Sequence, residues 1–172
     1  MTPLLRSPRP DGADAAGILA VHRAAFGRDD EARLVAHLQA AGHNSFELLA
    51  EQDGAVVAHV LFSPIRSEHG DDGRALGLAP VAVLPGWQGR GIGTALIRQA
   101  LAALHERGIP AVVVLGEPAY YARFGFAPAS RHGLVDTYGG GDDFMALALR
   151  PDGLDGRHGR VDYAPAFDLL TE

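Results

Sequence analysis

The chain has 172 residues, of which 47% are hydrophobic, and a formal net charge of −6 at pH 7. This length and composition indicate one globular enzyme domain with a substantial core, and the negative charge disfavours a general nucleic-acid binder. No apolar run reaches the roughly 18 residues that span a bilayer, so we expect a cytoplasmic protein without a membrane partner. Cysteine and lysine are absent, which excludes disulfides, thiolate nucleophiles, Schiff-base lysines and lysine-bearing phosphate loops.

The first half of the chain predicts an edge strand, two helices and a hairpin. Apolar residues recur at helical spacing in both helices, and Gly42 ends the second one. An Asp-Gly turn between two apolar runs is a strong hairpin signal. These elements start, in chain order, at Leu4, Asp14, Asp29, Glu47 and Ala55. The charged, glycine-rich residues 68–74 predict a loop.

The second half predicts strands that alternate with helices. They cover residues 76–84 (strand), 91–107 (helix), 111–115 (strand), 119–124 (short helix) and 144–149 (strand). The order predicts an α/β fold with a mixed, mostly antiparallel sheet and one right-handed crossover between residues 76 and 115. We expect a single domain over residues 1–172, with a core of about 2–150 and the tail 151–172 docked on it through aromatic residues.

The strongest functional signal is a glycine loop that follows an apolar strand and opens a helix, over residues 80–94. Glycines at 89, 91 and 93 let backbone N–H groups surround an anion without hindrance from Cβ atoms. The first turn of the helix adds unpaired N–H groups and the positive end of its dipole, and Arg90 adds a charge. The pattern predicts a phosphate site that needs no lysine.

Pro80 is a second signal, because proline cannot donate to a sheet ladder and marks an interrupted side of its strand. If this strand parts from the strand 111–115 near its end, Val81 and Val83 expose backbone groups in the gap. A pantetheine arm carries two amides and could hydrogen-bond there like an added strand.

The sequence Gln88-Gly89-Arg90-Gly91-Ile92-Gly93 resembles the Q/R-x-x-G-x-G/A motif of the GNAT N-acetyltransferase superfamily. Downstream, Tyr120-Tyr121-Ala122-Arg123-Phe124-Gly125-Phe126 resembles the tyrosine-bearing helix of that superfamily and the Gly-Phe that ends it. The whole chain is similar to a bacterial branch of predicted N-acetyltransferases. The resemblance implies a GNAT-like fold with a splayed strand pair and helices on both faces of the sheet.

The resemblance also implies an activity: direct transfer of an acetyl group from acetyl-CoA to a primary amine, of a small molecule or a peptide, in a ternary complex. A backbone N–H near Val81 would polarise the thioester carbonyl, and Tyr121 would protonate the departing thiolate. A phenol, with a pKa near ~10, is protonated at neutral pH. The implied cofactor-binding residues are Val81, Ala82, Val83, Gln88, Gly89, Arg90, Gly91, Ile92, Gly93 and Thr94.

The general base stays open at this stage. Many relatives carry a carboxylate on the strand before the glycine loop, and this chain has none there. Glu51, His59 and Glu117 are ionisable residues near strand ends, each with a structural role as the simpler interpretation; water could also carry the proton. The eight histidines show no metal-ligand spacing, so we expect no metal.

Two rival interpretations remain. A dinucleotide-binding unit would need a third glycine where Thr94 stands, and its motif would not follow a hairpin. An acyl-CoA-binding module without turnover is the second rival, since the strand carboxylate is missing. The acidic balance favours a cationic amine acceptor, and we expect a monomer or a homodimer.

Overall fold

The computed structural model describes residues 2–170, and the chain divides into two compact units. The first unit comprises Met1–Phe62, Ala79–Ala100 and Pro165–Glu172, and the second comprises Ser63–Leu78 and Leu101–Ala164. Three elements contribute residues to both units: β3 (Ala55–Pro64), β5 (Leu76–Val83) and α3 (Ile92–Glu106).

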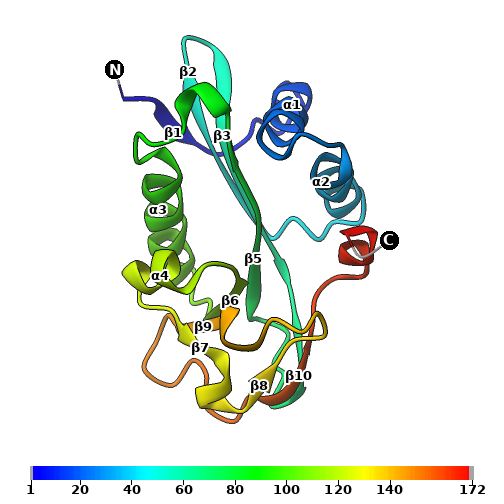
Figure 1. Cartoon of the computed structure of the whole chain (residues 1–172), viewed down its shortest axis with the longest axis vertical. Coiled ribbons are helices and arrows are strands. Elements are labelled where there is room, and N and C mark those ends of the chain that lie inside the picture. Colours follow the sequence, from blue (N-terminus) through cyan, green and yellow to red (C-terminus); the bar gives the residue numbers. More distant parts are fainter. Residues whose placement is uncertain (1, 171–172) are drawn as a thin grey trace. The chain divides into compact units, whose positions relative to one another are not determined.

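Antiparallel strands with helices beside them form the first unit. β1 (Leu4–Arg6) pairs with β2 (Phe46–Gln52), which in turn pairs with β3. α1 (Ala15–Phe26) and α2 (Asp30–Ala40) pack against each other. In Figure 1 these two helices lie on one side of β2 and β3, while the first turns of α3 lie on the other. The predicted edge strand, helices and hairpin are therefore confirmed.

The main sheet of the second unit has one parallel pair. β5 joins β6 (Ala111–Leu115) through the pairs Leu76–Val112 and Gly77–Val113. β9 (Phe144–Ala148) then runs antiparallel both to β6 and to the short β7 (Ala127–Pro128). The parallel pairing of β5 with β6 confirms the predicted crossover through α3.

A second, three-stranded sheet includes Glu68 and His69, the first two residues of the loop predicted at 68–74, while residues 70–74 have the irregular structure that was predicted. β4 (Arg66–His69) pairs with β10 (His158–Asp162), which runs parallel to β8 (Leu134–Val135). The strands are short, β4 and β10 are mostly polar, and none shows the alternation of apolar residues that would mark a strand. These strands are stabilised by partners far along the chain. For example, the backbone N–H of Arg160 donates to Glu68 Oε1 at 3.0 Å.

A compact apolar cluster forms the core of the second unit. It contains Ile65, Ala75, Ala111, Val113, Ala129, Leu134, Phe144, Ala146, Leu154 and Val161, with Tyr163 packed against it. The remaining helical segments are short: η1 (Pro85–Trp87), α4 (Pro118–Tyr121), η2 (Ala122–Phe124), η3 (Ala129–His132), η4 (Gly141–Asp143) and η5 (Pro165–Leu170). η5 packs against α2 in the first unit, with Phe167 buried. No helix of residues 2–170 has the length and apolar character of a membrane-spanning segment.

Candidate active site

The glycine loop of the first unit has the backbone that its sequence requires. Gly89 and Gly91 have φ angles of 75° and 79°, a left-handed conformation that residues with a Cβ rarely adopt. The helix follows at once, since the Ala95 N–H donates to the Gly91 carbonyl at 3.0 Å. Helix geometry leaves the N–H groups of the first turn, those of Ile92 and Gly93 among them, without an intrahelical acceptor. The loop therefore combines free backbone donors with the positive end of a helix.

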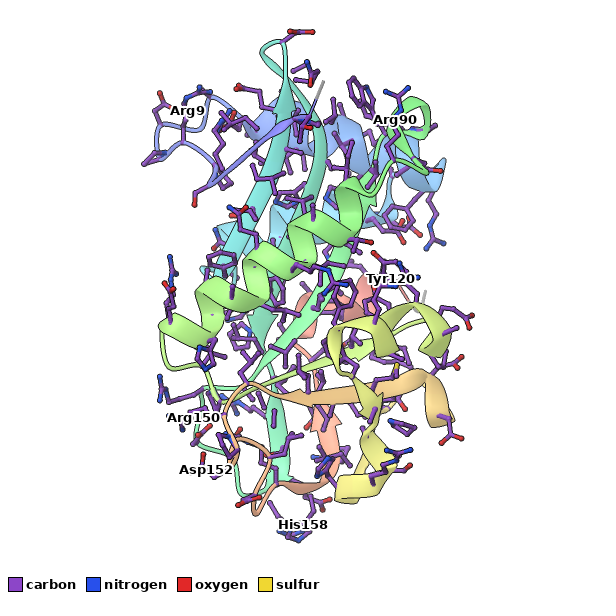
Figure 2. All side chains as sticks on the ribbon, turned by 90° about the vertical axis from the view of Figure 1, so that its left-hand side faces the viewer. Arg9, Arg90, Tyr120, Arg150, Asp152 and His158 are labelled. Atoms are coloured by element: carbon purple, nitrogen blue, oxygen red, sulfur yellow. The ribbon has the colours of Figure 1, made fainter. Side chains whose placement is uncertain are left out.

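Side chains of the same loop hold its shape. The Gln88 amide donates to the Val83 carbonyl at 3.0 Å, so this predicted cofactor residue closes the loop onto the strand before it. The Arg90 guanidinium lies 4.7 Å from the centre of the Trp87 ring and projects from the loop (Figure 2). A cavity of about 250 Å³ opens beside this pair, lined also by Gly91, Ile92 and Ala95 of α3 and by Thr2, Pro3 and Leu5.

The strand before the loop is anchored within the first unit. The N–H of Leu84 donates to the Val57 carbonyl at 2.9 Å, which fixes the end of β5 beside β3. Of the three predicted residues on β5, Ala82 is buried, while Val81 and Val83 are half-buried. All ten predicted cofactor residues thus lie in one continuous strand, loop and helix start.

Tyr121, the predicted acid, belongs to the second unit. It is the last residue of α4 and is 8% exposed, with its ring 5.8 Å from that of Phe126. Burial, with a smaller contribution from Tyr120, raises the pKa of its hydroxyl to about 12. Among residues 63–78 and 101–164, no group hydrogen-bonds to this hydroxyl. The side chain is therefore a protonated phenol whose donor is not used within its own unit.

Gly116 makes room for the Tyr121 ring. A Cβ at this position would overlap Cε2 of Tyr121 and stand 3.0 Å from Cδ2. The Gly116 N–H donates to the Asp143 carbonyl at 3.0 Å, which fastens the end of β6 to the loop that precedes β9. The position of the tyrosine thus depends on a glycine that the sequence motif does not include.

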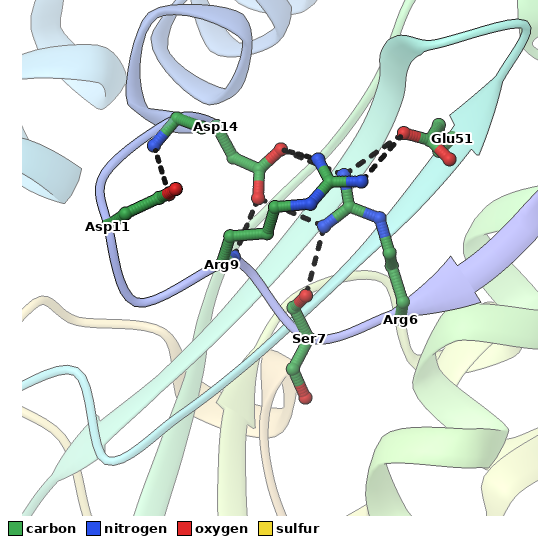
Figure 3. A network of polar contacts seen from close by, with 7 residues as sticks. Arg6, Ser7, Arg9, Asp11, Asp14 and Glu51 are labelled. Carbon is green, nitrogen blue, oxygen red and sulfur yellow. Dashed lines mark hydrogen bonds and ion pairs between the residues drawn. The ribbon is translucent and has the colours of Figure 1, made fainter.

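Glu51, the first candidate base, is committed to an ion-pair network of the first unit (Figure 3). Arg6 holds Asp14 through two hydrogen bonds of 2.9 and 2.8 Å and contacts Glu51 at 3.1 Å. Arg9 adds a backbone hydrogen bond of 2.7 Å to Asp14. The hydrogen bonds from Arg6 hold the pKa of the Asp14 carboxyl well below its usual range, despite burial. The network ties β1 and β2 to the start of α1.

His59, the second candidate base, is the middle member of a buried row of three hydrogen-bonded side chains, Glu47, His59 and His22. Its Nε2 lies 2.8 Å from Glu47 Oε1, and its Nδ1 lies 2.8 Å from Nε2 of His22. Both imidazoles have no exposed surface. Gln39 and Asn44 donate to the Glu47 carboxylate at 3.0 and 2.9 Å. Burial disfavours the charged carboxylate, yet the hydrogen bonds from His59, Asn44 and Gln39 outweigh it and lower the pKa of Glu47.

The sequence pattern did not single out His22, although a signal was present. His22 lies one helical turn after the buried Ile18 on α1, so it shares the inward face of that helix. Burial, with the positive field of His59, lowers the pKa of His22 to about 3. His59 and His22 are therefore parts of the interior of the first unit.

Glu117, the third candidate, is the residue before α4 and its side chain is exposed. Its carbonyl accepts hydrogen bonds from the N–H groups of Tyr120 and Tyr121, both at 3.1 Å. It therefore starts the helix that carries the tyrosine. Within residues 2–170, no group of three or more His, Asp or Glu side chains is arranged to hold a metal ion.

Residues 16–126 match the acetyltransferase (GNAT) family, which covers the glycine loop and the tyrosine segment. The chain is 40% identical over 157 residues to the uncharacterized N-acetyltransferase YhbS of Escherichia coli strain K12, covering 90% of this chain and 93% of that protein. A second E. coli relative, the uncharacterized N-acetyltransferase YjhQ, is 39% identical over 123 residues, which cover 70% of this chain and 68% of YjhQ.

Solved structures resemble the chain over nearly its whole length. The crystal structure of E. coli YhbS in complex with CoA superposes with a TM-score of 0.91 at 38% identity, covering 98% of this chain and 93% of that one. A GNAT family acetyltransferase from Brucella melitensis, in complex with acetyl-CoA, gives a TM-score of 0.80 at 39% identity, with 96% and 97% of the two chains covered.

Proposed function

Since the chain belongs to the acetyltransferase (GNAT) family and is an N-acetyltransferase, we propose that it moves the acetyl group of acetyl-CoA directly to a primary amine. The observation that carries this proposal is the glycine loop with its left-handed Gly89 and Gly91 at the start of α3. Solved relatives at 38% and 39% identity were crystallised with CoA and acetyl-CoA, which supports the same donor here.

In this proposal the donor is bound through backbone groups of the first unit. The N–H groups of residues 88–94 receive the pyrophosphate, where the dipole of α3 favours negative charge. Arg90 adds a charge-assisted contact from a side chain that already projects from the loop. The backbone of Val81 and Val83 pairs with the pantetheine amides, and an N–H near Val81 polarises the thioester carbonyl.

Tyr121 supplies the proton in this proposal. The amine attacks the thioester carbon, the C–S bond breaks, and the thiolate takes the hydroxyl proton of Tyr121. The raised pKa of about 12 keeps this hydroxyl protonated throughout the neutral range. A developing thiolate is a better hydrogen-bond acceptor than a neutral thioester sulfur, so the contact strengthens as the bond breaks.

A turnover assay tests the proposal. Purified protein is incubated with acetyl-CoA and a panel of primary amines; release of free CoA thiol is measured, and acetylated products are identified by mass. We expect CoA release that depends on the amine and matches product formed. If calorimetry detects no binding of CoA, the proposal fails. A protein that binds acetyl-CoA but acetylates no amine in the panel would instead be an acyl-CoA-binding module.

A further inference from the structure

Two imidazole rings lie against each other on the exposed surface of the three-stranded sheet in the second unit. His69 and His158 stand directly opposite each other where β4 pairs with β10. Their ring centroids are 4.5 Å apart, with 19° between the ring planes. His69 is 56% exposed, and the side chain of His158 is also exposed and projects from the ribbon (Figure 2). Both rings are therefore open to a solute.

A hydrogen bond to the backbone decides which nitrogen of His158 carries the proton. Its Nδ1 lies 3.2 Å from the carbonyl oxygen of Gly156, which can only accept, so Nδ1 carries the hydrogen of the neutral ring. The lone pair of the ring is then on Nε2. Histidines that bind metal ions commonly have this arrangement, in which one ring nitrogen donates to a carbonyl and the other binds the ion.

Close backbone contacts hold the two histidines together. Gly70 follows His69 and has a φ angle of 74°. A Cβ on Gly70 would overlap the carbonyl oxygen of Gly156, which is the oxygen that orients His158. A Cβ on Gly133 would stand only 3.5 Å from Cβ of His158. The backbone thus keeps the two rings side by side, and their side-chain torsions are the freedom that is left.

The charges beside the pair favour a cation. Glu68 Oε2 lies 4.0 Å from Nε2 of His69. The other carboxylate oxygen accepts the backbone N–H of Arg160 at 3.0 Å, which fixes the carboxylate beside the ring. The guanidinium of Arg160 donates to Asp162 at 2.9 and 3.1 Å, so its positive charge is balanced. A negative charge therefore stands next to the imidazole pair.

We propose that His69 and His158 bind one divalent transition-metal ion of the class of Zn²⁺, Ni²⁺ and Cu²⁺, through one ring nitrogen each. Neutral imidazole is a preferred ligand of these ions. In a tetrahedral zinc site, with Zn–N bonds of about 2.0–2.1 Å, two nitrogens stand about 3.3 Å apart. The rings must turn about χ2 to point their nitrogens at one ion, and this torsion is soft in histidine. Water completes the coordination, and Glu68 supplies a compensating charge.

An ion held in this way connects two strands that are far apart in the chain. It binds both histidines only when β4 and β10 are paired, so it stabilises the second sheet. The spacing of histidines in the sequence led us to expect no metal, because strand pairing alone brings these two together. With two protein ligands rather than the four of a structural zinc site, the ion exchanges with the solution. The site shares no residue with the glycine loop or the tyrosine segment.

Calorimetry on the full chain, freed of metal by a chelator, tests the proposal. We expect saturable binding of one Zn²⁺, Ni²⁺ or Cu²⁺ ion per chain, with Cu²⁺ the tightest, and no binding of Mg²⁺, which prefers oxygen ligands. His69→Ala and His158→Ala should each lower the affinity for Zn²⁺ at least tenfold, because a single imidazole cannot chelate. His105→Ala, at an exposed position of α3, is the matched control and should bind like the parent.

Two further measurements locate the ion. In the parent, less than one equivalent of paramagnetic Cu²⁺ should broaden the backbone amide signals of residues 68–70 and 157–159 before any others, an NMR experiment that needs no variant. Zn²⁺ at a hundredfold excess over its Kd should raise the midpoint of thermal unfolding of the parent by about 5–10 °C. Neither histidine variant should show this rise.

Three results overturn the proposal. The first is a parent that binds none of the three transition-metal ions with saturation. The second is a Zn²⁺ affinity that stays within about threefold of the parent in both histidine variants, since the ion would then bind elsewhere. The third is Cu²⁺ broadening that begins at residues outside the two segments.

Discussion

The glycine loop of the first unit and the tyrosine segment of the second use different parts of the chain for their chemistry. Residues 88–94 present backbone N–H groups, and their side chains mainly shape the loop, as Gln88 does through the Val83 carbonyl. In the tyrosine segment the reactive group that we propose is a side chain, Tyr121, which a close approach at Gly116 holds in place. A loop built from backbone tolerates changes of side chain and not of φ; a site built from side chains is sensitive to single atoms.

The units also differ in how they treat buried polar groups. In the first, Asp14 and Glu47 receive Arg, His and amide donors, and both histidines of the buried row are placed between partners or packed rings. In the second, the buried carboxylate of Asp136 accepts hydrogen bonds from the backbone N–H groups of Tyr138 and Gly140. The side-chain networks of the first unit therefore join separate elements, while the Asp136 carboxylate shapes a single loop of the second unit.

The largest expected effect is a loss of kcat when Tyr121 is replaced. Tyr121→Phe removes one oxygen and keeps the ring contacts with Phe124 and Phe126, so folding should hardly change. General acid catalysis contributes about 10²–10⁴-fold, and kcat should fall by that factor while CoA affinity is preserved. Single-turnover kinetics with an amine that the panel assay shows to be an acceptor measure the chemical step even where product release limits kcat.

Tyr120→Phe is the control for this substitution. Tyr120 lies next to Tyr121 and stacks with Arg123 at 4.4 Å, a contact that a phenylalanine keeps. It should react at close to the parent rate. If the rate of the chemical step in Tyr121→Phe also stays within about threefold of the parent rate, the thiolate leaves without help from Tyr121. The tyrosine segment would then have no catalytic role.

A substitution in the glycine loop should instead lower the affinity for CoA. Gly91→Val forces a β-branched residue into φ 79°, which distorts the turn before α3. CoA affinity should fall at least tenfold, about 1.4 kcal/mol, as measured by calorimetry on the folded variant. Gly86→Ala in the same segment is the control, since φ there is ordinary and a Cβ meets no atom within 4 Å. Unchanged affinity in Gly91→Val would mean that the loop does not bind the donor.

A smaller effect, on stability, should come from the buried histidines. The pKa of His22 is about 3 in the folded chain against an ordinary value of 6.5, so the unfolded chain binds a proton that the folded chain refuses. Stability should be complete above pH 6.5 and fall as the pH drops towards 3, by up to about 1.4 kcal/mol per pH unit from this group. Urea unfolding at pH 7, 6 and 5 measures the slope.

His22→Leu should reduce the dependence of the unfolding free energy on pH by the contribution of one bound proton. His105→Leu, at an exposed position of α3, should leave this dependence unchanged. Equal slopes in the parent and in His22→Leu would show that His22 titrates alike in both states. The first unit would then lack the acid sensitivity that its buried imidazoles predict.

The main elements and the glycine loop could be predicted from the sequence because their signals are local. Helical spacing gave α1, α2 and α3, and alternating glycines marked the turn before α3. The sheet of β4, β8 and β10 could not be predicted, since its strands are short and find partners far along the chain. Asp136 was not singled out for a related reason: its burial arises only when the loop after β8 folds back on the end of β6.

The Trp87–Arg90 contact gives the protein a built-in optical reporter. Trp87 is the only tryptophan of the chain, so all indole emission comes from the edge of the glycine loop. A phosphate that draws the guanidinium from its place 4.7 Å above the ring changes the electrostatic field on the indole. Occupancy of the loop can then be followed by intrinsic fluorescence, without a label, on the timescale of mixing.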